Sequence, residues 1–547
     1  MNKIKIMIVL ILIIIVALIV RIYQIEKVPP SLNIDESSEG YNAFSLLNTG
    51  KDRYGQGWPI LFRSFGSFQA PLYTYLTIIP IYFLGNTILA VRLVSIISGV
   101  LLIIITFFLI NKFNQQYKIN LAMIAGLTLT FTPWSVFFSR IGTEASLGVS
   151  LFALSFLILY LSLDRFWLFP LGVFILGLST HAYYSERIIS PFFLIGFIVL
   201  FRKRVFLKKK LFFFGMALFL LTQVPHLLIA ASGAFTRRLA QVDYLSDQFF
   251  QSNSGNLHNI FFGRQLFIIR EFITQYLTFF SPKNLFFDPD PQPDRSIPNL
   301  SVFYNWMLIP WLIGIGNFLK RRSEPAIKLF LLTIFLGPIP AALTRDPFYT
   351  LRTLIFLWIT TIMIALGISN FFSKISLKIT RYSLSFLLLS YSLFSLYLFY
   401  FTLFKYERAT FDYSYTKLLE KINQMPDKNF VIDSSRHLAA GIRAAFFNRY
   451  DPIKLQRDFK SHFPYKYYSS FEIEEPFILG KVDIRPIFWK KDICVSQILV
   501  GDLLAISENQ IKEHNLDFVF DVQDMAGNIS LKAYSTDPNK ACRRKEV

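Results

Sequence analysis

The sequence predicts a polytopic α-helical membrane protein with about eleven transmembrane helices, followed by a soluble C-terminal α/β domain. Of the 547 residues, 53% are hydrophobic and only 17% are charged, whereas soluble proteins carry nearer to a quarter of charged residues. The apolar residues gather in blocks about twenty residues long, which is the length that crosses a bilayer. The Lys and Arg behind the net charge of +20 gather in short loops between these blocks. That pattern is typical of cytoplasmic loops, so no nucleic-acid partner is predicted.

The first apolar block covers residues 3–22 and follows a short basic start. It is long for the apolar part of a signal peptide, and residues 21–24 offer no small-residue cleavage site. We therefore expect a retained helix with its N-terminus in the cytoplasm. The other predicted spans are residues 90–110, 121–139, 145–163, 166–181, 188–201, 211–231, 300–318, 329–343, 351–371 and 383–404.

The basic loops determine the predicted topology. With these spans, every strongly basic short loop, such as residues 202–210 and 320–328, lies on the cytoplasmic side of the plasma (inner) membrane. The apolar segment 72–84 is short and carries prolines, and counting it as a span would move the later basic loops outside. We therefore place residues 23–89 in one long outer loop whose helices lie on the membrane surface. Residues 232–299 form a second long outer loop, and the transmembrane domain covers residues 1–404.

The composition changes after residue 404, where charged residues return and short β-like runs alternate with helical patterns. Residues 405–547 are predicted to form an extracytoplasmic α/β domain. Its predicted strands are residues 429–433, 477–487, 518–522 and 529–534, and its predicted helix is residues 438–447. Cys494 and Cys542 both lie here, but two cysteines do not define a disulfide framework, and their pairing stays open.

Two adjacent carboxylates, Asp35 and Glu36, follow the first span by about a dozen residues. Carboxylates at the edge of the membrane core are costly unless they are solvated or used. Such a carboxylate can accept a proton from an attacking hydroxyl as a general base. The pair is also suited to hold a divalent cation, although nothing in the sequence requires one. The structural alternative is the first turn of a helix, where acidic residues are favoured, since residues 37–47 look helical.

Charged and aromatic residues gather at the predicted outer ends of later spans. Arg140 and Glu144 are able to pair across one helical turn, or to contact a substrate. Tyr183 fits an interfacial aromatic belt but also stands beside Arg187, which sits close to the apolar phase.

Further cations occur at Lys283 and at Arg352, between the ninth and tenth spans. Cations at the outer mouth of apolar helices are suited to bind a phosphate, because guanidinium matches phosphate with two parallel hydrogen bonds. Snorkelling toward lipid headgroups explains any single one of them equally well.

The order of these motifs resembles the GT-C fold glycosyltransferases of family 39, the relatives of protein O-mannosyltransferases and lipid A aminoarabinose transferases. The resemblance rests on Asp35 and Glu36 soon after the first helix, on residues 71–73 (Pro-Leu-Tyr), and on residues 91–93 (Val-Arg-Leu) opening the second span. Segments that also look like bacterial members are residues 183–191, 281–284 and 338–344. The resemblance covers about residues 1–404, and the Trp-Trp-Asp-type motif of oligosaccharyltransferases is absent from the sequence.

The resemblance implies a donor in which a hexose or pentose is linked to a polyprenyl phosphate, and an acceptor hydroxyl on a protein, lipid or glycan. Asp35 would be the base that activates this hydroxyl in one inverting displacement, and Glu36 would support it. Three cations, Arg187, Lys283 and Arg352, would stabilise the leaving phosphate.

The resemblance also assigns Glu144 to an acidic position in the second outer loop of the family. Arg140 and Tyr183 complete the candidate substrate contacts. Some relatives with this fold use a divalent metal.

A transporter or flippase for lipid-linked sugars is the alternative function. Such a protein should carry ionisable residues inside its spans near the bilayer midplane. Here the spans hold almost none, and the charges gather at the span ends, which favours an enzyme acting at the interface. A membrane scaffold whose outer domain binds a partner is a third interpretation, in which the Asp35 loop would have no special role.

Overall fold

The computed structural model describes residues 3–113, 120–407, 411, 413–436, 440–462, 466–469 and 476–541. The chain divides into two compact units, which we call unit 1 and unit 2. Unit 1 comprises Met1–Gln24, Ala70–Tyr73 and Arg92–Thr402. Unit 2 comprises Ile25–Gln69, Thr74–Val91 and Leu403–Val547.

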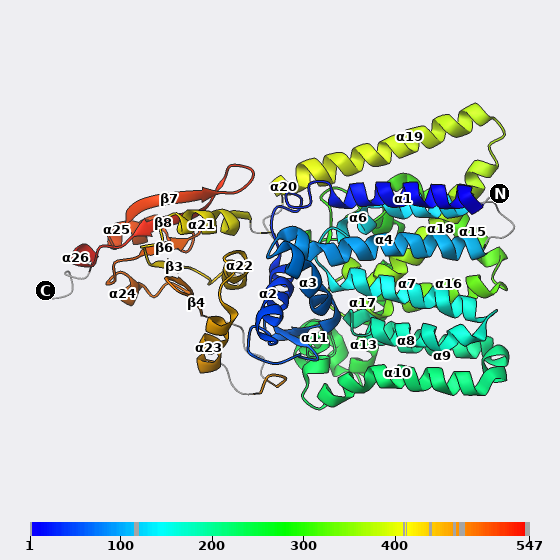
Figure 1. Cartoon of the computed structure of the whole chain (residues 1–547), viewed down its shortest axis with the longest axis horizontal. Helices are drawn as coiled ribbons and strands as arrows, with labels where there is room; N and C mark the ends of the chain where they lie inside the picture. The colour runs from blue at the N-terminus through cyan, green and yellow to red at the C-terminus, as the bar shows by residue number, and fades with distance from the viewer. Residues whose placement is uncertain are drawn as a thin grey trace. The chain divides into compact units, whose positions relative to one another are not determined.

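Unit 1 is built from long apolar helices, and each of the eleven predicted spans overlaps one of them, although α15 begins eight residues after the start of the predicted span 300–318 (Figure 1). These helices are α1 (Lys3–Ile22), α4 (Ile88–Phe113), α5 (Asn120–Phe131), α7 (Glu144–Ser162), α8 (Phe169–Ser179), α9 (Tyr184–Val205), α10 (Lys209–Ala230), α15 (Leu308–Lys320), α16 (Pro325–Leu336), α18 (Leu354–Ser373) and α19 (Lys378–Leu396). Within the described ranges, 6 stretches are long and apolar enough to cross a membrane, and α9 and α10 together form one of them. The predicted polytopic helical fold is therefore confirmed.

Two of the predicted spans are broken near one end. Helix α6 (Pro133–Phe138) follows α5 after Thr132, and α17 (Ile339–Ala342) follows α16 after Pro338. Proline lacks the backbone N–H that continues a helix, so α6 begins at Pro133 and α17 begins directly after Pro338.

Helices α15 and α18 cross at a very short distance because both carry glycine at the crossing. A Cβ atom added to Gly367 would lie 1.7 Å from the carbonyl oxygen of Pro310, and one added to Gly314 would lie 2.2 Å from that of Met363. Close backbone approach through small residues is a common way to associate helices in membranes. Helix α18 is accordingly buried along most of its length.

Helix α19, the yellow helix at the edge of the bundle in Figure 1, is packed very differently. Its buried residues are Ser392, Ser395 and Leu396, all near its C-terminal end. Phe386 and Leu387 are 73% and 61% exposed. A helix that exposes apolar side chains over most of its length is suited to face lipid rather than water.

The loop between α10 and α15 is mostly helical, and its short helices lead back to the bundle. They are α11 (Ala234–Val242), α12 (Asp247–Asn253), α13 (Gly263–Thr278) and α14 (Pro282–Phe286). A short 3₁₀ turn, η6 (Thr350–Thr353), opens α18.

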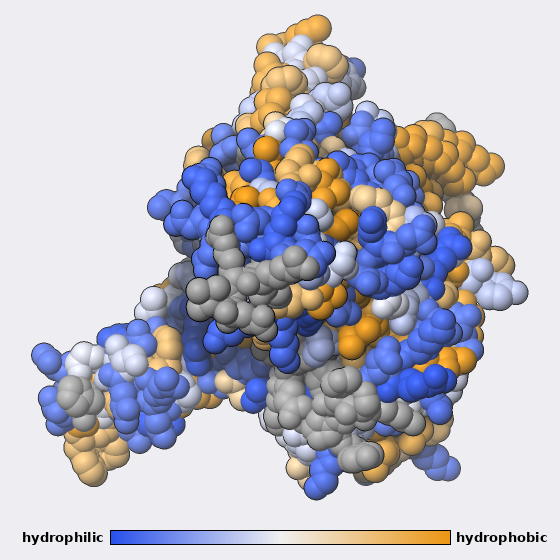
Figure 2. Space-filling model, turned by 90° about the vertical axis from the view of Figure 1, so that its left-hand side faces the viewer, coloured by the Kyte–Doolittle hydropathy of each residue, from blue (hydrophilic) through white to orange (hydrophobic). Residues whose placement is uncertain are grey.

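Unit 2 contains a mixed six-stranded sheet in the order β4-β5-β3-β6-β8-β7. Its strands are β3 (Phe430–Ile432), β4 (Phe477–Leu479), β5 (Val482–Ile484), β6 (Ile498–Gly501), β7 (Asp517–Gln523) and β8 (Ile529–Ser535). Strand β3 runs parallel to β5 and β6, and the remaining pairs are antiparallel. The predicted C-terminal α/β fold is therefore confirmed. The face of the molecule that Figure 2 shows is mainly hydrophilic, with smaller hydrophobic patches.

The helices of unit 2 come from both ends of the chain. The early ones are α2 (Ile34–Thr49) and most of α3 (Pro71–Leu84), and a hairpin of β1 (Phe62–Ser64) and β2 (Ser67–Gln69) lies between them. The late ones are α20 (Phe404–Glu407), α21 (Tyr413–Asn423), α22 (Ala440–Phe447), α23 (Pro452–His462), α24 (Trp489–Asp492), α25 (Glu508–Glu513) and α26 (Pro538–Ala541). That α3 lies on the membrane surface stays a prediction.

The strand predictions are correct in three places and wrong in one. Strands β3, β7 and β8 occur where predicted, but residues 477–487 form the hairpin β4–β5 instead of a single strand. The chain turns at Gly480, whose φ of 69° is a left-handed conformation that glycine adopts without strain. Strand β6 was not predicted. The predicted helix is present as α22, while residues 438 and 439, and Cys542 with its pairing to Cys494, lie outside the described residues.

Candidate functional site

The adjacent carboxylates Asp35 and Glu36 both lie in the first turn of α2, but they differ in burial and in the hydrogen bonds that they accept. Asn33 caps the helix, since its Oδ1 accepts from the backbone N–H of Glu36 at 2.8 Å. The Glu36 Oε2 accepts in return from the Asn33 N–H at 2.9 Å, which completes a capping box. Glu36 is fully buried in this role, whereas the Asp35 side chain is exposed. The helical alternative is therefore correct for this segment, and it leaves Asp35 facing outward.

A row of hydrogen bonds leads from the interior of unit 2 to Asp35. Arg53 donates from Nη1 to the Ser38 Oγ at 2.6 Å, and Ser38 donates to the Gln69 Oε1 at 2.8 Å. Gln69 then donates from Nε2 to the Asp35 Oδ1 at 3.1 Å. Because the Gln69 amide is fixed on its oxygen side, its N–H group is directed to the carboxylate. The β1–β2 hairpin supplies Gln69 as the last residue of β2.

The C-terminal part of the chain holds the helix that carries Asp35. Tyr41 donates to the carbonyl oxygen of Tyr450 at 3.0 Å, and Arg443 donates from Nε to the carbonyl oxygen of Leu32 at 2.9 Å. At Gly40 an added Cβ would lie 2.7 Å from the ring of Phe446, so α2 and α22 approach closely. Residues of the first loop and of the C-terminal domain therefore share one hydrophobic core.

In unit 1, four candidates meet around the N-terminal ends of α7 and α9. Glu144 begins α7 and is buried, and Tyr183 is the residue before α9. Tyr183 interacts electrostatically with Glu144 and Arg352, and Arg187 interacts with Glu144 as well. Burial, followed by the neighbouring Tyr349, raises the pKa of the Tyr183 phenol well above its usual range. This phenol therefore stays protonated and is available as a hydrogen-bond donor.

The two arginines of this cluster are held by weak interactions, namely long hydrogen bonds to backbone carbonyls and contacts with aromatic rings. Arg187 donates to the carbonyl oxygens of Thr180 at 3.3 Å and Phe235 at 3.4 Å, and its guanidinium lies 4.2 Å from the ring centre of Tyr184. Arg352 lies 3.9 Å from the ring centre of Tyr349.

Each arginine also has a guanidinium nitrogen that is available to donate a hydrogen bond. Among the described residues, Nη2 of Arg187 and Nη1 of Arg352 are buried and have no hydrogen-bond partner. The cluster thus holds two guanidinium groups that are able to bind an anion.

The turn η6, which carries Arg352, is fastened by a buried ion pair that the sequence did not single out. Asp290 accepts from Thr350 through its N–H at 3.0 Å and its Oγ1 at 2.7 Å. Arg295 lies 3.3 Å from Asp290 and stacks 3.5 Å from the ring centre of Tyr349. Residues 290–295 of the second long loop therefore position the same tyrosine that contacts Arg352.

The remaining two candidates have different surroundings. Arg140 lies between α6 and α7, so the premise that it shares a helical turn with Glu144 is wrong. It is fully buried and donates from Nη1 to the carbonyl oxygens of Val20 and Arg21, each at 2.8 Å. Lys283 is exposed and forms an ion pair with Asp288 at 3.2 Å.

The structure thus brings together Glu144, Tyr183, Arg187 and Arg352 in unit 1, whereas Asp35 and Glu36 belong to unit 2. Sequence reasoning missed Gln69, Ser38, Asp290 and Arg295, whose only sequence signal was their position in the two long predicted loops. Within the described ranges, no group of three or more His, Cys, Asp or Glu residues is arranged to hold a metal ion.

Residues 69–229 match the family model of dolichyl-phosphate-mannose-protein mannosyltransferases. A search of curated protein sequences finds no match.

Among solved structures, ArnT from Cupriavidus metallidurans bound to undecaprenyl phosphate is similar with a TM-score of 0.53, at 10% identity over 97% of both chains. The archaeal oligosaccharyltransferase AglB from Archaeoglobus fulgidus, in complex with an inhibitory peptide and a dolichol-phosphate, has a TM-score of 0.51 at 12% identity. That match covers 97% of this chain and 74% of AglB. The expected resemblance is thereby confirmed, and the chain is a membrane protein with the fold of the GT-C glycosyltransferases.

Proposed function

We propose that this chain is a membrane glycosyltransferase that moves a hexose or pentose from a polyprenyl-phosphate donor to an acceptor hydroxyl at the outer face of the plasma membrane. Two structural neighbours support the donor class, since one is bound to undecaprenyl phosphate and the other to a dolichol-phosphate. The acceptor is a protein, lipid or glycan, and the N-terminus faces the cytoplasm. The transmembrane catalytic domain comprises residues 1–404, and residues 405–547 form the extracytoplasmic domain.

Asp35 is the proposed general base. The observation that carries this assignment is that Asp35 is exposed and receives a hydrogen bond from Gln69, while the adjacent Glu36 is engaged in the capping box. In the reaction the acceptor O–H bond breaks and its proton passes to the Asp35 carboxylate. The acceptor oxygen bonds to the anomeric carbon as the bond from that carbon to the phosphate oxygen breaks. The configuration of the sugar inverts, and the electron pair leaves with the polyprenyl phosphate.

Arg352 and Arg187 are the proposed ligands of the donor phosphate, with Arg352 the principal one. The leaving phosphate gains negative charge as the sugar departs, and guanidinium donors at a low-dielectric interface stabilise that charge. The protonated Tyr183 phenol adds a neutral donor, and Glu144 orients Arg187 through its charge. The exposure of Lys283 and its pairing with Asp288 make it a weaker candidate, and Arg140 supports the site through the backbone it binds.

The test is sugar transfer from radiolabelled polyprenyl-phosphate hexoses and pentoses to crude envelope acceptors, in membranes with matched expression. We expect Asp35→Asn to lower the rate by about 10²-fold or more, because an amide accepts no proton at neutral pH. Gln69→Leu should lower kcat by roughly fivefold, because it removes one charge-assisted hydrogen bond from an exposed carboxylate.

Glu36→Gln is the matched control, since glutamine at this position also completes a capping box and should leave transfer near the wild-type rate. Equal transfer by the wild type and Asp35→Asn would contradict the assignment of the base. Movement of the lipid-linked sugar across the membrane without transfer would favour a flippase instead.

A further inference from the structure

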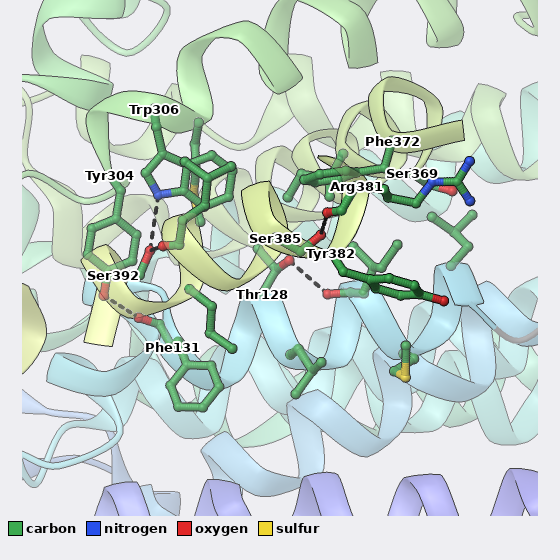
Figure 3. Close-up of a pocket in the computed structure, with 18 of the residues that line it drawn as sticks. Thr128, Phe131, Tyr304, Trp306, Ser369, Phe372, Arg381, Tyr382, Ser385 and Ser392 are labelled. Carbon is green, nitrogen blue, oxygen red and sulfur yellow. Dashed lines mark hydrogen bonds between the residues drawn. The ribbon is translucent and has the colours of Figure 1, made fainter. Parts of the chain in front are cut away.

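A cavity of ≈ 770 Å³ opens between α5, the C-terminal end of α18 and α19 in unit 1 (Figure 3). It contains none of the proposed catalytic or phosphate-binding residues. Its walls are mainly apolar, as at Leu121, Ile124 and Leu127 of α5 and at Leu388 and Leu389 of α19. The buried residues of α19 all lie near its C-terminal end, and the cavity lies along the less buried part of the helix.

One end of the cavity is closed by hydrogen-bonded aromatic residues. Trp306 donates from Nε1 to the Ser392 Oγ at 3.0 Å, which ties α19 to the residues before α15. Tyr304 donates to the carbonyl oxygen of Phe131 at 2.8 Å. In Figure 3 these four residues gather at one side of the view.

Arg381 stands at the other end, beside Ser369 and Phe372 in Figure 3. Its Nη2 donates to the carbonyl oxygen of Ile375. In the part of the chain that the structure describes, its buried Nε has no hydrogen-bond partner. A buried cationic donor left without an acceptor is costly, so this end of the cavity is suited to a negatively charged group.

The distance between the two ends of the cavity indicates the length of the molecule that would fill it. Arg381 and Ser392 are separated by 11 residues along α19, which corresponds to about 17 Å at the helical rise. One leaflet of the hydrocarbon core is about 15 Å thick. An apolar channel of that length, with a cation at one end and an aromatic closure at the other, matches one glycerophospholipid whose acyl chain extends from its headgroup into the membrane.

We propose that this cavity is a binding site for an anionic glycerophospholipid. Its phosphate receives hydrogen bonds from Arg381, and one acyl chain lies along the apolar walls toward Trp306. The neighbouring Lys374 and Lys378 add positive charge at the headgroup end and favour an anionic over a zwitterionic lipid. The lipid fills the space between α5 and α19 and thereby holds α19 to the bundle. This proposal does not depend on the proposed glycosyltransferase activity.

The test is native mass spectrometry of the full chain, delipidated in detergent and then supplied with phosphatidylglycerol or phosphatidylcholine. We expect the wild type to retain one phosphatidylglycerol about tenfold more strongly than phosphatidylcholine, and Arg381→Gln to remove that preference. Lys378→Gln is the matched comparison: it removes the same charge one turn away at a residue that does not line the cavity, and we expect it to reduce the preference clearly less than Arg381→Gln does. Ser385→Trp, which places a large ring in the cavity, should abolish the retention of both lipids.

An unchanged lipid preference in Arg381→Gln, or an equal loss in Lys378→Gln, would overturn the proposal. Thermal unfolding of the delipidated variants checks that they are folded. Undecaprenyl phosphate is the competing probe. If it displaces phosphatidylglycerol one for one and its retention also requires Arg381, then the site belongs to the polyprenyl lipid and the proposal fails.

Discussion

The ion pair between Asp290 and Arg295 should contribute strongly to the stability of unit 1, although a very similar pair two residues earlier should contribute almost nothing. All four residues belong to the second long loop. The side chains of Asp290 and Arg295 are 0% and 4% exposed, whereas those of Asp288 and Lys283 are 48% and 75% exposed.

The expected magnitudes follow from this difference in burial. Asp290→Ala leaves the buried Arg295 guanidinium with only the longer ion pair to the half-exposed Asp346, at 3.5 Å, and removes the acceptor of the Thr350 N–H and hydroxyl. Breaking a buried pair in this way costs about 3–5 kcal/mol. Asp288→Ala removes an exposed pair with Lys283, which is worth roughly 0–1 kcal/mol.

Thermal unfolding of the purified full chain in detergent, followed by tryptophan fluorescence, provides the assay. We expect Asp290→Ala to lower the midpoint by about 5 °C, and Asp288→Ala to lower it by less than about 1 °C. Asp290→Asn should fall between them, because its amide oxygen still accepts from Thr350. Equal shifts for the two alanine variants would refute the reasoning from burial. Because Asp290 binds the turn that carries Arg352, we also expect Asp290→Ala to weaken sugar transfer at subsaturating donor.

Two further predictions concern unit 2 and the helix crossing. Burial alone would raise the pKa of Asp492, but hydrogen bonds from Arg485 and from the Phe488 N–H hold it below its ordinary value of 3.8. The stabilisation from this carboxylate is therefore present above pH 3.8 and is lost as the pH falls through the lower folded-state pKa. Asp492→Asn should lower the free energy of unfolding by about 1–3 kcal/mol at neutral pH, and should make the free energy of unfolding depend less on pH in the acid range. At the crossing of α15 and α18, Gly367→Ala should destabilise the protein by about 1–3 kcal/mol, because its methyl group meets a backbone carbonyl. Gly316→Ala on α15, where nothing lies within 4 Å, should leave the unfolding midpoint unchanged.

The helical architecture of unit 1 could be predicted because the hydrocarbon core imposes one dominant rule on sequence. Every span needs a long apolar run, and such runs are visible without any knowledge of tertiary contacts. The meeting of Tyr183, Arg187 and Arg352 was also within reach, since all three follow or precede spans at the same predicted side. Charged residues are rare inside the spans, so those at the predicted outer ends are easily recognised in the sequence.

Features that depend on contacts between distant residues could not be predicted. The hydrogen bond from Gln69 to Asp35 joins residues 34 positions apart, and no spacing rule connects them. The hairpin within residues 477–487 was missed because apolar residues on both sides of Gly480 look like one strand. Strand β6 consists of four buried residues, a run too short to distinguish from a loop by periodicity.

The contact between α2 and the C-terminal domain has a consequence for the order in which the protein is made. Arg443 lies 411 residues after Leu32, and Gln456 lies 411 residues after Ser45, yet each pair is hydrogen bonded. During synthesis, the segment bearing Asp35 leaves the ribosome early, before any of the later spans has been translated. Its final packing surface exists only after α22 and α23 have been translated. In a nascent or truncated chain, the Asp35 segment would therefore lack its packing partners. Catalytic activity would then appear only after all the spans have been inserted into the membrane.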